Sequence, residues 1–247
     1  MTIIKYPDES EVDLVFDEKD HKYKVDDDII PSVTKVIDNI VPVYLTKWAA
    51  NEGAAWFKRN AQRGWNLNDE EDVEKIVQGI ANAHIVISRT ALDIGKVVHG
   101  YIEEAIEWSL GELSDMPEMP EDEAAVNSIQ AFGEWVREND VEWVTTEERI
   151  YSKKYKYAGT VDAVAIIDDK FSVIDFKTSK QIYKSYKLQV YAYKQAIEEM
   201  YGKEVESCWI LRFDKTTGKF QAKEIKENYL PAFIKGLDFY NEYRSRR

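Results

Sequence analysis

The stretch that decides the fold is residues 159–180, GTVDAVAIIDDKFSVIDFKTSK. Its two halves are rich in β-branched and aromatic residues, and Asp168 and Asp169 separate them. Apolar runs of this length, divided by a short polar turn, are typical of two adjacent antiparallel strands. The sequence therefore predicts a β-hairpin with its turn at Asp168 and Asp169.

The register of this hairpin follows from the length of its loop. With a two-residue loop Ile167 pairs with Lys170, and counting back along both strands places Asp162 opposite Asp175. Directly opposed residues have Cβ atoms about 4.5 to 5.5 Å apart. A three-residue loop would break this register unless a bulge restored it. The two-residue loop predicts a carboxylate pair on one face of the sheet.

A cation joins this pair, because Lys177 lies two residues beyond Asp175 and strand alternation puts both on one face. Two carboxylates so close repel each other unless positive charge lies between them, and a hard divalent cation bound through oxygens is the natural occupant. The lysine is placed to orient or deprotonate a water, or to stabilise charge that builds up in a transition state.

The simpler alternative is that Asp162 and Asp175 only form ion pairs with lysines on a solvated face. It fits poorly here, because the surrounding strands are apolar on both faces, as Val161, Val164 and Ile174 illustrate. Both acids are therefore expected in buried central sheet, where an unpaired charge is costly.

The rest of the chain favours an α/β fold, with a mixed central sheet flanked by helices. A short hairpin is expected over residues 12–25, before a helix start at Pro31 and Ser32. Apolar periodicity predicts helices near 32–40, 46–62, 70–108, 122–139, 184–201 and 227–244, and strands near 143–152, 158–167, 171–177, 205–213 and 219–225. Helices followed by meandering strands and a further helix predict one domain, 1–247, with an N-terminal hairpin and helical elaboration over 1–140 and a catalytic α/β core over 141–247.

Charge is distributed unevenly along the chain, whose formal net charge is −13. Residues 101–148 hold fifteen acids and a single base, Arg137, whereas residues 149–187 hold nine bases and four acids. The overall charge argues against a partner as anionic as nucleic acid, but the basic segment carries the motif and provides a field that favours phosphates.

Only one cysteine is present, Cys208, which excludes an intramolecular disulfide and a multi-cysteine metal or iron-sulfur site. The N-terminus lacks the features of a signal peptide, and no apolar run reaches the roughly 18 residues that span a bilayer. These observations predict a soluble cytoplasmic protein without a membrane partner.

In its ordered motifs the sequence resembles the PD-(D/E)XK nucleases, in particular the RecB-like branch that includes phage exonucleases. GTVD is followed by IDFKTSK and then by LQVYAY, and the motifs span residues 95–193, about two fifths of the chain. The resemblance implies a restriction-endonuclease-like core, cleavage of DNA phosphodiester bonds with Mg²⁺ or Mn²⁺, and a phage or bacterial host cytoplasm.

The resemblance also assigns roles to particular residues. Asp162, Asp175 and Lys177 match the catalytic positions, and both acids match metal ligands. The expected additional metal ligands are His99, from the upstream GKVVHGYIEE pattern, and the main-chain carbonyl of Phe176. Supporting or DNA-binding positions are expected at Glu103, Glu148, Thr178, Ser179, Lys180, Gln189 and Tyr193.

Two competing functions stay open at this point. One is a non-catalytic DNA-binding or assembly protein that keeps the nuclease fold, although all three core positions are intact. The other is a carboxylate-pair hydrolase acting on sugars, which leaves the strand lysine without a role. Without a phosphate-binding GxxxxGK[ST] loop, the chain is expected to act alone or beside a separate motor, recombination or replication protein, on single- or double-stranded DNA.

Overall fold

The computed structural model describes residues 1–26, 28–41, 45–179, 181–214 and 219–245, without the side chains of 45, 46, 88–94, 244 and 245. Its strands are β1 (Thr2–Lys5), β2 (Glu11–Asp17), β3 (Lys22–Val25), β4 (Asp28–Ile30), β5 (Val141–Ser152), β6 (Tyr157–Ile167), β7 (Lys170–Thr178), β8 (Ser207–Phe213) and β9 (Phe220–Glu224). Its helices are α1 (Val33–Ile40), α2 (Leu45–Asn60), α3 (Glu70–Ser109), α4 (Glu123–Glu138), α5 (Lys184–Tyr201) and α6 (Leu230–Ser245).

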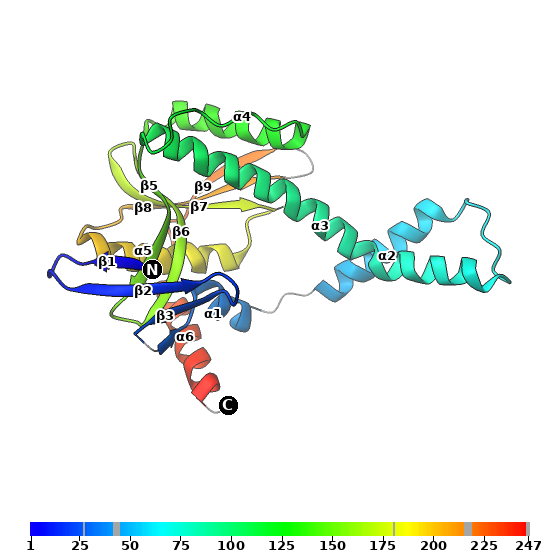
Figure 1. The fold of residues 1–247 in the computed structure, drawn as a ribbon, viewed down its shortest axis with the longest axis horizontal. Helices are drawn as coiled ribbons and strands as arrows, with labels where there is room; N and C mark the ends of the chain where they lie inside the picture. The colour runs from blue at the N-terminus through cyan, green and yellow to red at the C-terminus, as the bar shows by residue number, and fades with distance from the viewer. Residues whose placement is uncertain (27, 42–44, 180, 215–218, 246–247) are drawn as a thin grey trace. The chain divides into compact units, whose positions relative to one another are not determined.

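A five-stranded sheet in the order β5-β6-β7-β8-β9 forms the centre of the fold (Figure 1). Only β7 and β8 pair in parallel, because the helix α5 connects them, and the other neighbours are antiparallel. The sheet is therefore mixed, which confirms the predicted α/β class. β7 is the middle strand, and its apolar residues are buried from Phe171 to Phe176.

Helices cover both faces of this sheet. The helix α5 packs on one face, where Tyr191, Ala192 and Ile197 join the main core, and α1 and α6 contact α5 from the same side. On the other face α4 places Phe132 against Phe176 and Phe213, with ring centroids 5.8 and 6.2 Å apart. The predicted flanking helices are confirmed, and their observed ends lie within three residues of the predicted ones.

The N-terminal segment is larger than the predicted hairpin over residues 12–25. It forms a four-stranded antiparallel sheet in the order β1-β2-β3-β4, of which the hairpin is the centre. Leu14 and Tyr23 are buried beneath it, and the Tyr6 hydroxyl donates a 2.7 Å hydrogen bond to the carbonyl of Tyr151 on β5. The edge strands have four and three residues, too few to show a periodic pattern.

The chain divides into two compact units, residues 1–41 with 97–247, and residues 42–96. The first unit contains both sheets and α1, α4, α5 and α6. In the second unit α2 approaches α3 closely at Gly79, because a Cβ there would collide with the ring of Trp56. The division into two compact units does not test whether residues 1–247 act together as one nuclease domain, so that stays a prediction.

Across the described residues, no helix combines the length and the apolar character that crossing a membrane requires.

Candidate active site

The β6–β7 hairpin has the predicted two-residue loop. Ile167 pairs with Lys170, and Asp168 and Asp169 have φ angles of 48° and 65°. Positive φ at both central residues is the geometry of a type I′ turn, whose twist matches that of the flanking strands. The expected register is therefore confirmed at the turn.

This register brings the two aspartates of the motif together. The β6–β7 pairing extends to Ala163 and Ile174, so the next position along each strand holds Asp162 and Asp175. There the Asp162 carboxylate takes the place of a ladder partner, since its Oδ2 accepts a 2.6 Å hydrogen bond from the backbone N–H of Phe176. The Thr146 hydroxyl bonds to the Asp162 carbonyl at 2.9 Å, which fixes the backbone of β6 at this point.

Asp175 is completely buried, and Lys177 is its nearest cation. The Lys177 Nζ donates to Asp175 Oδ1 at 2.6 Å and lies 5.3 Å from the centroid of the Tyr186 ring. Burial raises the pKa of the Asp175 carboxyl and the Asp162 charge raises it further, while the Lys177 ammonium opposes both. Asp175 Oδ2 is buried and makes no hydrogen bond within the described part of the chain. A buried carboxylate oxygen left without a partner is costly, and it marks a position that a cation would satisfy.

Two further carboxyl groups lie within electrostatic range of Asp162. Burial raises the pKa of Glu147 to about 8, with contributions from the charges of Asp162 and Glu103. The pKa of Glu103 is also raised, first by burial and then by neighbouring acids that include Asp162. We call Asp162, Asp175, Glu147 and Glu103 the acidic cluster. The Lys177 ammonium acts on two members of the cluster, because it lowers the pKa of both Asp175 and Glu147.

His99 is mostly buried beside this cluster. Its ring meets Phe176 edge-on, with ring centroids 6.1 Å apart. Burial lowers the pKa of His99, the charge of Asp162 raises it, and that of Lys177 lowers it. The net lowering favours the neutral imidazole, which keeps a nitrogen lone pair available as a ligand.

The second part of the motif contacts the first. The Gln189 Nε2 donates to the Tyr193 hydroxyl at 2.7 Å, and the charges of Asp175 and Asp162 add to the burial that raises the pKa of Tyr193. A Cβ on Gly159 would lie 2.9 Å from Cε1 of Tyr193. The glycine of GTVD therefore makes room for the tyrosine of LQVYAY, which seats α5 against β6 behind the aspartates.

Other expected site residues lie apart from the acidic cluster or bind protein groups. The Glu148 carboxylate accepts a 2.8 Å hydrogen bond from Tyr201, and Glu148 lines a separate cavity with Thr2 and Met200. Ser179 uses its backbone N–H and its hydroxyl on the carbonyls of Phe213 and Gln181. Thr178 ends β7 in register with Phe213, and Lys180 lies outside the described residues.

Glu147 is the member of the acidic cluster that the sequence reasoning missed. Its neighbours Thr146 and Glu148 pair with Ala163 and Val161, so Glu147 lies beside Asp162. Adjacent residues of a strand face opposite ways, and the sequence offered the pair Glu147 and Glu148 without showing which one faces inward. A register shift between Trp143 and Thr145 sets that phase.

The acidic cluster suits a hard divalent cation. No group of three or more His, Cys, Asp or Glu side chains among the described residues has the arrangement of a ready metal site. Mg²⁺ does not require one, because it usually binds through one or two carboxylates and keeps several waters. Asp162 and Asp175 provide two carboxylates, and the partnerless Asp175 Oδ2 provides a free lone pair. The donor set therefore fits Mg²⁺ or Mn²⁺.

Comparisons with known proteins give limited likeness. No family model and no curated protein matches the sequence. Among solved structures, a candidate exonuclease from Eubacterium rectale matches at 14% identity and a TM-score of 0.40, over 64% of this chain and 66% of that one. The alkaline exonuclease LHK-Exo from Laribacter hongkongensis matches at 14% identity and a TM-score of 0.31, over 62% of this chain and 90% of its own. Structural likeness at this level carries no argument about function.

Proposed function

We propose that this protein is a divalent-metal-dependent deoxyribonuclease that hydrolyses phosphodiester bonds at the acidic cluster. The observation that carries the proposal is the buried Asp175 Oδ2, which has no hydrogen-bond partner among the residues that the structure describes and lies beside Asp162 and the Lys177 ammonium. A strand pair that buries one acid completely and leaves a second acid and a lysine only partly exposed is expensive to fold, and desolvated charges of this kind are typical of functional sites.

In this proposal Asp162 and Asp175 hold the cation, with His99 and the Phe176 carbonyl as further ligands. A Mg²⁺ or Mn²⁺ ion bound there supplies positive charge against the phosphate and lowers the pKa of a water. The acidic cluster supports this, because cation binding would relieve the repulsion that adds to burial in raising the pKa of Glu147 and Glu103.

Lys177 has a role that the acids cannot fill. Its Nζ has three N–H donors, and Asp175 Oδ1 uses one of them, which leaves others for an oxygen of the scissile phosphate. Because the lysine is held by the carboxylate and by the Tyr186 ring, its charge is already oriented before substrate arrives. Gln189 and Tyr193 lie on α5 and support β7 behind the lysine. The hydrogen bond between their side chains holds the Tyr193 ring in place.

DNA is the proposed substrate, and the likeness of the motifs to RecB-like nucleases favours exonuclease action. The test uses the purified protein and Lys177→Ala, each with end-labelled single- and double-stranded DNA in Mg²⁺, in Mn²⁺ or with chelator. We expect the wild type to cleave DNA only when Mg²⁺ or Mn²⁺ is present. The ladder of products then shows from which end the DNA is degraded.

The control is Lys226→Ala. The side chain of Lys226 is 79% exposed, compared with 18% for Lys177. It should cleave as the wild type does, while Lys177→Ala should not. Binding of DNA by the wild type without cleavage in any metal would replace the nuclease proposal with a non-catalytic DNA-binding role.

A further inference from the structure

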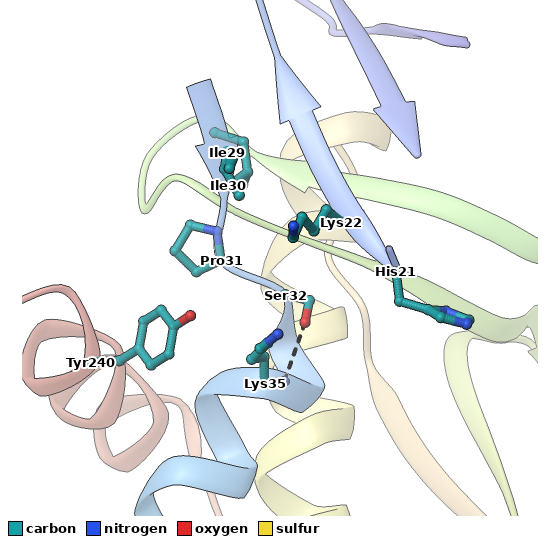
Figure 2. Close-up of a pocket in the computed structure, with 8 residues that line it drawn as sticks. All are labelled: His21, Lys22, Ile29, Ile30, Pro31, Ser32, Lys35 and Tyr240. Carbon is teal, nitrogen blue, oxygen red and sulfur yellow. Dashed lines mark hydrogen bonds between the residues drawn. The ribbon is translucent and has the colours of Figure 1, made fainter. Parts of the chain in front are cut away.

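A small cavity lies apart from the acidic cluster, between the N-terminal sheet and the helices α1 and α6 (Figure 2). Its volume is about 150 Å³, and its polar side chains come from His21, Lys22, Ser32, Lys35 and Tyr240. Drug-sized ligands occupy cavities of about 300 to 1,000 Å³, so this one suits a single small group.

The polar lining of the cavity is cationic and hydroxylic. Figure 2 shows Lys22, Lys35 and Tyr240 reaching it from β3, α1 and α6, three elements far apart in the sequence. No Asp or Glu lines it among the residues that the structure describes. Two ammonium groups and two hydroxyls without a carboxylate form a donor set that suits an anion.

The two lysines differ in how far they are already neutralised. Lys22 pairs with Asp20 at 3.0 Å, with both side chains about half exposed, so water and salt weaken that pair. In the described part of the chain, the Lys35 ammonium and the Tyr240 hydroxyl have neither an ion pair nor a hydrogen bond. Ser32 holds the first turn of α1, because its Oγ accepts from the backbone N–H of Lys35 at 3.2 Å. The lining is therefore held in place while its charge stays available.

The backbone ties this cavity to the strand that carries Asp162. Ser32 bridges to Ala158 on β6, and the Ala158 N–H donates to the Pro31 carbonyl at 3.0 Å. Ala158 lies four residues before Asp162 on the same strand, which is about 13 Å at the usual rise per residue. Along the axis of a duplex, each strand carries one phosphate about every 3.4 Å. A chain cleaved at Asp162 therefore has other phosphates within reach of this region.

We propose that this cavity binds a phosphate group of the nucleic-acid substrate, a few nucleotides from the bond that is cleaved. Lys22 and Lys35 neutralise the phosphate, and the hydroxyls of Ser32 and Tyr240 donate to its oxygens. The inference rests on the proposed function for the identity of its ligand. The phosphate belongs either to a backbone diester or to a terminal monoester, and free phosphate shares the same chemistry.

The test measures binding without cleavage. The Lys22→Gln/Lys35→Gln double variant is compared with Lys19→Gln/Lys24→Gln, which removes two charges from the turn before β3 and from β3 itself, at positions that do not line the cavity. Both are made in the Lys177→Ala background and kept in chelator. The affinity for a fluorescent single-stranded oligonucleotide, with 5′-hydroxyl or 5′-phosphate, is followed against salt, and thermal unfolding is followed against inorganic phosphate at constant ionic strength.

We expect the cavity variant to bind about tenfold more weakly than the control, with a slope of log affinity against log salt smaller by about 0.7 for each phosphate that the protein no longer neutralises. An equal loss for both oligonucleotides identifies a backbone diester, and a loss confined to the 5′-phosphorylated one identifies a terminal monoester. Stabilisation by inorganic phosphate that disappears in the cavity variant, with no DNA binding by any protein, keeps the anion site while the nuclease proposal fails. Equal oligonucleotide affinity and equal phosphate response in both variants would overturn the inference.

Discussion

Two of the chain's Asp-x-Lys triplets pair their own aspartate with their own lysine, and the difference between these two pairs shows which one is a candidate for chemistry. Asp20 and Lys22 form a 3.0 Å pair with side chains 51% and 41% exposed, at the start of β3. Asp175 and Lys177 form a 2.6 Å pair with side chains 0% and 18% exposed, on the central strand β7. The spacing and the contact are alike, so the motif itself carries little information.

Burial and neighbours separate the two pairs. An exposed pair contributes about 0 to 1 kcal/mol to stability, and water already solvates its charges. At β7 Asp175 loses that solvation completely and Lys177 loses most of it, and Asp175 Oδ2 finds no replacement among the described residues. The comparison teaches that the cost of desolvation, rather than the ion pair, marks the site.

The largest predicted effect is on catalysis when the buried pair is broken. Asp175→Asn and Lys177→Ala should each lower the single-turnover cleavage rate by about 10²- to 10³-fold. Because both act on one phosphate, the double variant should lose little more than the worse single variant. Rates measured under enzyme excess test this, and losses that multiply in the double variant would show that the two residues act separately.

Metal binding should stabilise the buried site and leave the exposed one unaffected. At Mg²⁺ about 100 times above its Kd, the free energy of unfolding should rise by about 2.7 kcal/mol relative to chelator. Denaturant unfolding measures this for the wild type and for Asp162→Asn, in which the gain should vanish. Asp20→Asn is the matched control and should keep the full gain, and an equal gain in all three proteins would place the metal elsewhere.

The packing behind the buried pair is tested at Gly159. Gly159→Ala should destabilise the fold by about 1 to 3 kcal/mol, because the new methyl group meets the Tyr193 ring. Gly133→Ala on α4 is the contrast, since its Cβ meets nothing closer than 3.6 Å and alanine favours a helix by about 1 kcal/mol. Thermal melts of both variants in chelator test this prediction. An unchanged melting temperature for Gly159→Ala would mean that the contact with Tyr193 does not position α5.

The smallest predicted effect concerns Cys208, which pairs with Val173 on β7 and reports whether the sheet is closed. Burial raises the pKa of its thiol to about 12, so almost no thiolate exists at pH 8. A colourimetric disulfide reagent should label the native wild type and Asp20→Asn far more slowly than protein in denaturant. Rapid labelling of the native protein would show that the sheet around Asp175 opens.

The sequence was most informative where local chemistry decides the outcome. The Asp168-Asp169 turn set the register of β6 and β7, because a two-residue loop between twisted strands leaves few alternatives. Helical periodicity located α3 and α5 closely, since each buries one face over many turns. The same pattern could not locate β1 and β4, whose few residues are held by their neighbours rather than by their own preference.

The candidate site was predictable in its strands and less so around them. Asp162, Asp175 and Lys177 come together through hairpin register alone. Whether Glu147 or Glu148 faces the site depends on the register shift at Trp143 and on a positive φ of 47° at Glu147. Neither feature can be predicted from the residue types. Nor does sequence show that Lys22, Lys35 and Tyr240 line one cavity, because they meet only through tertiary packing.

The most direct test of the account is one cleavage experiment on the two triplets. Asp175→Asn and Asp20→Asn each remove one carboxylate charge from an Asp-x-Lys pair, and both are assayed beside the wild type on the same end-labelled DNA, in Mg²⁺ and in chelator. We expect metal-dependent cleavage by the wild type and by Asp20→Asn, and a loss of about 10²- to 10³-fold in Asp175→Asn. Cleavage by Asp175→Asn at the wild-type rate, or cleavage that persists in chelator, would contradict it.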